Sequence, residues 1–84
     1  MSVTVNFPAS LSHFAGQSVI VRESVANVGQ LVQALDRIAP GLAKELDDPL
    51  YNFAINQEIL LHGVDSRPVS DGDVVEIIPS MSGG

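Results

Sequence analysis

The most chemically suggestive residues are Gly83 and Gly84, which close the sequence after the small-residue segment Ser80-Met81-Ser82. A free terminal carboxyl has a reference pKa of about 3.3 to 3.7, so at neutral pH it is an anion that must be activated before a nucleophile can attack it. Glycine has no Cβ and can thread a narrow channel without side-chain clashes. We therefore predict that Gly84 is the reacting residue. A frayed terminus remains the alternative interpretation of the glycine pair alone.

The segment before Gly84 predicts how the carboxyl reaches a partner. Residues 80–84, fully extended, span at most about 17 Å, enough to carry a carboxyl from a domain surface into another protein. Enclosure there would keep water from a reactive acyl intermediate. We predict a domain over residues 1–79, a flexible tail over residues 80–84, and threading of Met81, Ser82 and Gly83 into the partner.

A second candidate site lies on the predicted last strand, residues 74–78. If Val75 and Ile77 face the core, alternation places the intervening side chains on the opposite face, beside the tail. Two aliphatic residues around a carboxylate suit an apolar partner surface with a basic rim. The predicted docking residues are Val74, Glu76, Ile78 and Pro79. The alternative is an inner strand that is covered on both faces.

Other chemistries lack their residues. The chain contains no cysteine, so disulfides, thiolate nucleophiles and cysteine metal sites are excluded. His13 and His62 are far apart and outside any ligand motif, and Asp71-Gly72-Asp73 lacks the other ligands of a calcium loop. Neither a nucleophile elbow nor a phosphate-binding glycine loop is present. We expect no metal, no intrinsic cofactor and no catalysis by this chain alone.

The composition predicts the kind of partner. Ten acidic residues against four basic ones give a formal charge of −6, which disfavours nucleic acid and anionic membranes and favours basic protein surfaces. The sequence has room for one small domain, and 45% of its residues are hydrophobic. It shows neither a secretory signal nor a membrane-spanning run, so we expect a cytoplasmic protein.

The sequence predicts one amphipathic helix over residues 28–39. Asn27 is a credible N-cap, Gln30 can complete a variant of the capping box, and Pro40-Gly41 supplies the stop. Apolar residues recur between these signals with helical spacing: Val28, Leu31, Val32, Leu35, Ile38 and Ala39. We expect Leu31, Leu35 and Ile38 to lie in the core.

The remaining elements are predicted to be mostly strands. Alternation and turn residues indicate strands over residues 3–7, 18–22, 51–56, 59–61 and 74–78. Residues 8–16 are interpreted as a loop or turn anchored by Leu11 and Phe14. A short helical turn over 42–46 closes at Asp47-Asp48-Pro49, and Asp71-Gly72 turns the chain into the last strand.

This order of elements predicts an α+β fold, the β-grasp or ubiquitin-like arrangement, in which one main helix covers a small mixed sheet. A ferredoxin-like fold is the alternative, and it needs a second full helix.

Several of these segments together resemble the sulfur-carrier family of the MoaD/ThiS type. The matching segments are Val3-Thr-Val-Asn-Phe-Pro8, Val28-Gly-Gln-Leu-Val-Gln-Ala-Leu35, Pro40-Gly-Leu42, Asp71-Gly-Asp-Val-Val-Glu-Ile-Ile-Pro79 and the final Gly83-Gly84. The resemblance spans essentially the whole chain. Its most specific part combines the Asp-Gly-Asp turn, the apolar strand and the glycine pair. One departure is Ser12, where many members carry an arginine.

The resemblance implies a reaction and its partners. An ATP-dependent adenylyltransferase related to ubiquitin-activating enzymes would adenylate Gly84, and a sulfurtransferase acting as sulfur donor would displace AMP to leave a thiocarboxylate. A biosynthetic enzyme would then accept the sulfur, with this chain as carrier or as the small subunit of a synthase. The molybdopterin-forming and cysteine-forming branches are favoured. The alternatives are a ubiquitin-like interaction module and a protein-conjugation module.

Overall fold

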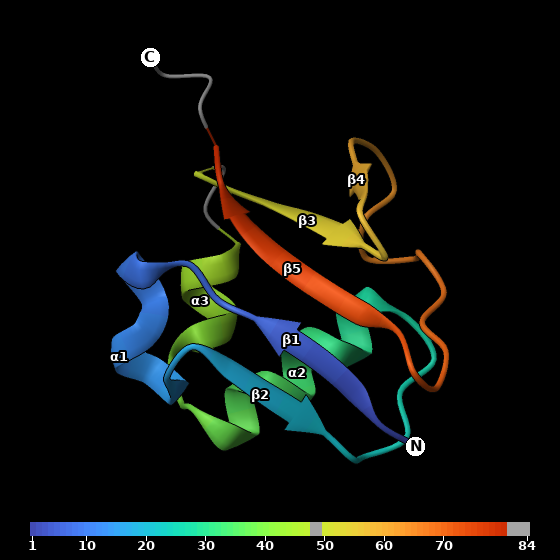
Figure 1. The fold of residues 1–84 in the computed structure, drawn as a ribbon, viewed down its shortest axis with the longest axis horizontal. Coiled ribbons are helices and arrows are strands. Elements are labelled where there is room, and N and C mark those ends of the chain that lie inside the picture. The colour runs from blue at the N-terminus through green and yellow to red at the C-terminus, as the bar shows by residue number, and fades with distance from the viewer. Residues whose placement is uncertain (48–49, 81–84) are drawn as a thin grey trace.

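The computed structural model describes residues 1–47 and 50–80. Five strands form one mixed sheet in the order β2-β1-β5-β3-β4 (Figure 1). The strands are β1 (Val3–Asn6), β2 (Ser18–Val21), β3 (Tyr51–Ile55), β4 (Glu58–Leu60) and β5 (Val74–Pro79). The central pair, β1 and β5, is parallel, and the other three pairs are antiparallel. The predicted mixed sheet is confirmed, with the last strand at its centre.

The described residues also form four helical segments. They are the 3-10 helix η1 (Ala9–Leu11), α1 (Ser12–Ala15), α2 (Val28–Ile38) and α3 (Leu42–Leu46). Figure 1 shows α2 and α3 behind the sheet, whose opposite face is open. Within residues 1–47 and 50–80, α2 is the only helix longer than five residues, so the second full helix of the ferredoxin-like alternative is not found there.

Strand alternation builds the core between the sheet and α2. Val3 and Val5 of β1 and Val75 of β5 are fully buried, because their side chains point toward the helix side of the sheet. Leu31 and Leu35 of α2 meet them and are also buried. Alternation along the strands and helical spacing along α2 predict these buried positions. Every buried residue of this core is apolar.

The prediction that Ile38 belongs to the core is wrong, since its side chain is 52% exposed. Ile38 is the last residue of α2, and the backbone leaves helical geometry at Ala39. Ala39 and Leu42 then fill the neighbouring core space, and both are buried. A helical pattern therefore overestimates the buried stripe at the point where the chain turns from α2 into α3.

Of the two interpretations of residues 8–16, a loop or a turn, the structure shows the turn, because η1 and α1 form two short helical turns there. The Ser12 hydroxyl donates a hydrogen bond to the Ala9 carbonyl at 2.9 Å, which links the two turns. Leu11 is fully buried, as predicted, and Phe14 packs partly buried against the core. Turns of three or four residues are too short for a periodic apolar pattern to reveal.

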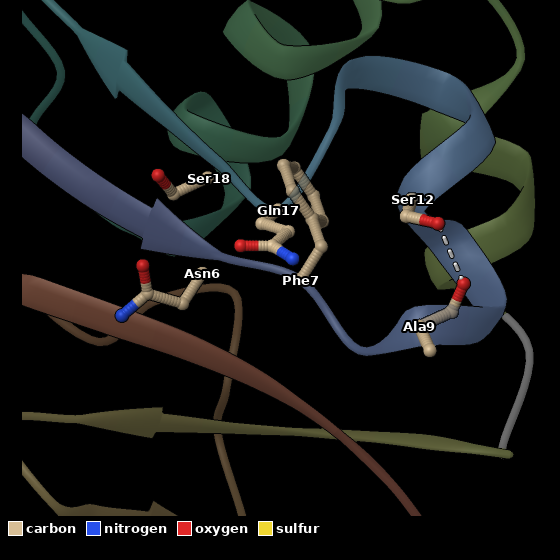
Figure 2. A pocket seen from close by; sticks show the side chains of 6 residues that line it. All are labelled: Asn6, Phe7, Ala9, Ser12, Gln17 and Ser18. Carbon is tan, nitrogen blue, oxygen red and sulfur yellow. Dashed lines mark hydrogen bonds between the residues drawn. The ribbon is translucent and has the colours of Figure 1, made fainter.

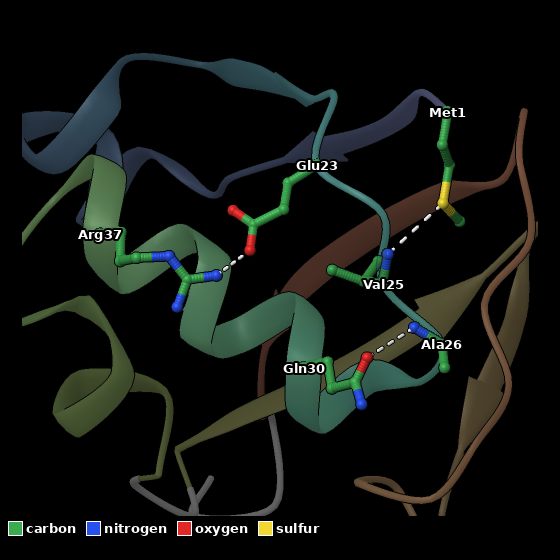
Figure 3. A network of polar contacts seen from close by, with 6 residues as sticks. All are labelled: Met1, Glu23, Val25, Ala26, Gln30 and Arg37. Carbon is green, nitrogen blue, oxygen red and sulfur yellow. Dashed lines mark hydrogen bonds and ion pairs between the residues drawn. The ribbon is translucent and has the colours of Figure 1, made fainter.

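The start of α2 is closed by its own side chains and by a distant loop. The Asn27 side chain accepts a hydrogen bond from the Gln30 backbone N–H, which confirms the N-cap. The Gln30 side chain accepts from the N–H of Ala26, one residue before the N-cap (Figure 3). The first two N–H groups of the helix, those of residues 28 and 29, donate to the carbonyls of Arg67 and Asp65, respectively. Residues 65–67 thus complete the cap.

Candidate functional site

The predicted reaction centre falls beyond the described residues. Met81, Ser82, Gly83 and Gly84 lie outside them, so the assignments to these four residues remain predictions. The last described residue is Ser80, directly after β5. The structure therefore bears on how the end of the domain is held and on which surface surrounds it.

The predicted docking residues divide between the two faces of β5. Val74, Glu76 and Ile78 lie on the open face, where Val74 is exposed and the other two are half-buried. Val75 and Ile77 are buried on the helix side, as predicted. The alternative of a strand covered on both faces is therefore not observed.

Pro79 is separated from the three open-face residues. It pairs with Tyr51 of β3 in the sheet register. Alternation places it on the helix side, exposed at the end of the strand. The structure thus brings three of the four predicted docking residues together. Docking at this face remains a prediction.

Glu76 occupies the middle of the open face. The register places it between Asn6 of β1 and Ala54 of β3. Among the strand residues that share this face, Glu76 is the only ionisable one; the full set is Thr4, Asn6, Ser18, Ile20, Asn52, Ala54, Ile59, Val74, Glu76 and Ile78. Ile20 and Ile59, on the two edge strands, are each about half exposed. The face therefore offers aliphatic groups around one negative charge.

Two hollows adjoin this face. The larger, of about 420 Å³, lies at the loop between β1 and β2. Figure 2 shows the side chains that line it: Asn6, Phe7, Ala9, Ser12, Gln17 and Ser18. The smaller, of about 270 Å³, is lined by Asn56, Gln57, Val74 and Glu76. Apart from Glu76, the polar side chains in both hollows are amides and hydroxyls.

Asn56 is a supporting residue that the sequence analysis missed. It begins the two-residue turn between β3 and β4, with φ of 50° at Asn56 and 75° at Gln57. Asparagine tolerates this left-handed conformation, so an asparagine at this position is the sequence feature that could have indicated the tight turn. The Asn56 side chain accepts from the Val74 N–H at 3.0 Å and donates to the Asp73 carboxylate at 3.1 Å. It thereby fixes the start of β5.

The Asp71-Gly72-Asp73 segment is the predicted turn. Gly72 has a φ of 87°, a conformation that glycine adopts without strain. Asp71 accepts a hydrogen bond from the Ser2 N–H at 2.7 Å, and Asp73 accepts from the Ser70 N–H at 2.8 Å. Both carboxylates therefore serve to hold the turn and the amino-terminal segment together.

An ion pair at the edge strand β4 shifts the pKa values of both of its members. Both terminal nitrogens of Arg67 donate to the Glu58 carboxylate, at 3.0 and 3.3 Å. These hydrogen bonds, with the attraction between the charges, lower the pKa of Glu58 and raise the pKa of Arg67. The pair joins β4 to the loop that caps α2.

The described part of the chain offers neither a metal-binding cluster nor a membrane-spanning helix. No group of three or more His, Cys, Asp or Glu side chains there could hold a metal ion. His13 packs beside the ring of Phe14, with ring centroids 4.5 Å apart. None of the helices in these residues has the length and apolar character needed to cross a bilayer.

The fold and its open face define a class of protein. A mixed sheet of this strand order, packed against one main helix, is the β-grasp or ubiquitin-like arrangement, and solved structures confirm that prediction. A model of the ThiS family matches residues 5–84, so the chain belongs to the ThiS family. The predicted MoaD/ThiS-type sulfur-carrier family is thereby confirmed.

The relatives found are sulfur carriers and proteins of the same fold. The sulfur carrier protein CysO of Mycobacterium tuberculosis is 29% identical over 93 residues, covering all of both chains. The structure of the BexX/CysO complex of Amycolatopsis orientalis matches with a TM-score of 0.82 and 26% identity, over 98% of this chain and 99% of that one. A putative molybdopterin converting factor subunit of Pyrococcus furiosus shares the fold, with a TM-score of 0.77, 21% identity and coverage of 96% and 99%.

Proposed function

We propose that Gly84 of this protein is the sulfur-carrying residue. Its carboxylate would attack the α-phosphorus of ATP on an adenylyltransferase, release pyrophosphate and form an acyl-adenylate. A sulfur donor would then displace AMP and leave a thiocarboxylate. The observation that carries this proposal is the family match, which runs through residue 84 of a chain without cysteine.

The division of labour between this chain and its enzymes follows from its residues. The open face presents one carboxylate among aliphatic, amide and hydroxyl groups, so the groups that bind ATP and activate the carboxyl belong to the partner. The protein then acts as a non-catalytic co-substrate without an intrinsic cofactor, and ATP is consumed by the activating enzyme. The adenylyltransferase, the sulfurtransferase and the sulfur-accepting enzyme are the partners this role requires.

The open face is the proposed docking surface for these partners. Val74 and Ile78 would contact apolar side chains, and Glu76 between them would meet a basic residue. A negatively charged carrier steers toward positively charged surfaces, which fits the formal charge of −6. The related CysO is seen in complex with BexX, a precedent for stable protein docking by a carrier of this fold.

The accepting pathway is proposed from the relatives. Of the two favoured branches, the similarity to CysO over the whole chain supports the cysteine-forming one. This choice depends on sequence similarity, because the described surface carries no feature specific to either branch.

A test separates the carrier from a ubiquitin-like interaction module. Purified protein is mixed with the adenylyltransferase of the same organism, and ATP–pyrophosphate exchange is measured against carrier concentration. Exchange should depend on the carrier and disappear when Gly83-Gly84 are deleted. The deleted form should still bind the enzyme, because the open face is intact. Full exchange by the deleted form would overturn the proposal and favour the interaction module.

A further inference from the structure

The ladder between β3 and β5 continues beyond the last strand residue. Pro79 lies opposite Tyr51 in the register, and the Ser80 N–H then donates to the Leu50 carbonyl at 2.5 Å. Figure 1 shows the end of β5 beside the start of β3. Ser80, the first residue of the predicted tail, is therefore tied to the sheet by its backbone.

Tyr51 braces this last hydrogen bond from the helix side. It shares the alternation of the buried Phe53 and packs partly buried against the core. Its hydroxyl lies 3.1 Å from the Ser10 hydroxyl on η1. Ser10 follows β1, the other neighbour of β5 in the sheet. The end of β5 is thus held by β3, and the first residue of β3 is in turn held to the segment after β1.

We propose that Ser10, Leu50 and Tyr51 form a tail clamp, which fixes the point from which the last four residues extend. The clamp would be a positioning device for the chemistry at Gly84, and it rests on the proposed function. Four residues beyond Ser80 span at most about 14 Å, and each residue released from the ladder adds about 3.5 Å. A closed clamp therefore limits the length of chain between the sheet and the Gly84 carboxyl.

The length of this tether affects the reaction after docking. When one surface of a protein is already bound, a tethered group reaches its site with an effective concentration that depends on the tether, and excess length lowers it. The clamp consists of a backbone hydrogen bond and a hydroxyl pair on the helix side, whereas Val74, Glu76 and Ile78 lie on the open face. Opening the clamp should therefore slow adenylation within the complex, seen in kcat, and leave docking, seen in KM, nearly unchanged.

The direct test removes one hydrogen-bond donor. Ser80→Pro deletes the N–H that binds Leu50, and Pro79 before it already lies in a strand, the conformation that a following proline favours. Ser80→Ala keeps the N–H and is the matched control. In ATP–pyrophosphate exchange with the cognate adenylyltransferase, Ser80→Pro should lower kcat by about 2- to 10-fold relative to Ser80→Ala, the range expected for one lost hydrogen bond. Equal kcat values for the two variants would overturn the clamp.

Tyr51→Phe and Ser10→Ala provide a second arm that leaves the backbone of the tail unchanged. Each removes one partner of the hydroxyl pair, so each should lower kcat, and the double variant should lower it no further than the larger single effect. A wild-type kcat in both single variants would overturn the role of the pair. A rise in KM at constant kcat would also contradict positioning, because it would place Tyr51 in the docking surface.

The clamp can also be tested without any enzyme. Amide hydrogen exchange on the wild-type chain should show the Ser80 N–H exchanging more slowly than an unstructured amide, and Ser80→Ala should keep this protection. Exchange at the unstructured rate would overturn the clamp. If the wild-type protein supports no pyrophosphate exchange, the proposed function fails, and the Ser80 amide still decides whether the clamp exists.

Discussion

At the scale of single residues, chemistry and recognition are assigned to different places. Gly84 would carry sulfur, and Glu76 would supply the charge that a partner meets on the open face. Both assignments come from local patterns in the sequence, a glycine pair and strand alternation, and both roles remain predictions. It did not predict Asn56, Tyr51 or Ser10, whose roles depend on contacts between segments that are distant in the chain.

Reversing the charge of Glu76 tests the docking face. Glu76→Lys should weaken binding to the adenylyltransferase, mainly by slowing association, and the loss should shrink as salt is added. Glu45→Lys is the matched control, because it makes the same charge change on α3, at an exposed position on the helix side of the molecule. Surface plasmon resonance at several ionic strengths measures both. Equal weakening by the two variants would show a general effect of net charge and contradict docking at Glu76.

At the scale of elements, helix α2 shows what local patterns can and cannot determine. The N-cap and the buried stripe through Leu35 follow from spacing and capping rules. The exposure of Ile38 depends on the path of the chain into α3, and the cap from residues 65–67 depends on irregular backbone hydrogen bonds. Neither of these leaves a periodic mark in the sequence.

The two ends of the apolar stripe should differ in their contribution to stability. Leu35→Ala should lower the free energy of unfolding by about 2 to 5 kcal/mol, because a cavity forms in the core. Ile38→Ala, on the same helix, should change it by about 0.5 kcal/mol or less, because Ile38 is largely exposed. Urea titrations followed by circular dichroism measure both. Similar losses for the two variants would mean that Ile38 is buried after all.

The ion pair between β4 and the capping loop predicts a pH dependence. The pKa of Glu58 is lower in the folded protein than its ordinary value of 4.5, chiefly because of the hydrogen bonds from Arg67. Its contribution to stability is therefore present above the unfolded pKa and is lost as pH falls through the folded pKa. Thermal melts should show a small advantage of wild type over Glu58→Gln at pH 7 that shrinks as the pH is lowered below the ordinary value of 4.5. A difference that is constant with pH would contradict the pair.

At the scale of the whole molecule, the fold was predictable because one strong helix and several alternating strands allow few arrangements. The parallel pairing of β1 with β5 places the last strand at the centre of the sheet, where both neighbours hold it. In the proposed function, a strand held on both sides would keep the recognised surface fixed while Gly84 reacts.

Intact-mass spectrometry measures directly whether Gly84 carries sulfur. The protein is incubated with its cognate adenylyltransferase, ATP and a sulfur donor, and fragmentation locates any change. One oxygen of the Gly84 carboxyl should be replaced by sulfur, and this change should require ATP and be absent after deletion of Gly83-Gly84. An unchanged mass with an adenylyltransferase that is active on this chain would show that Gly84 does not carry sulfur.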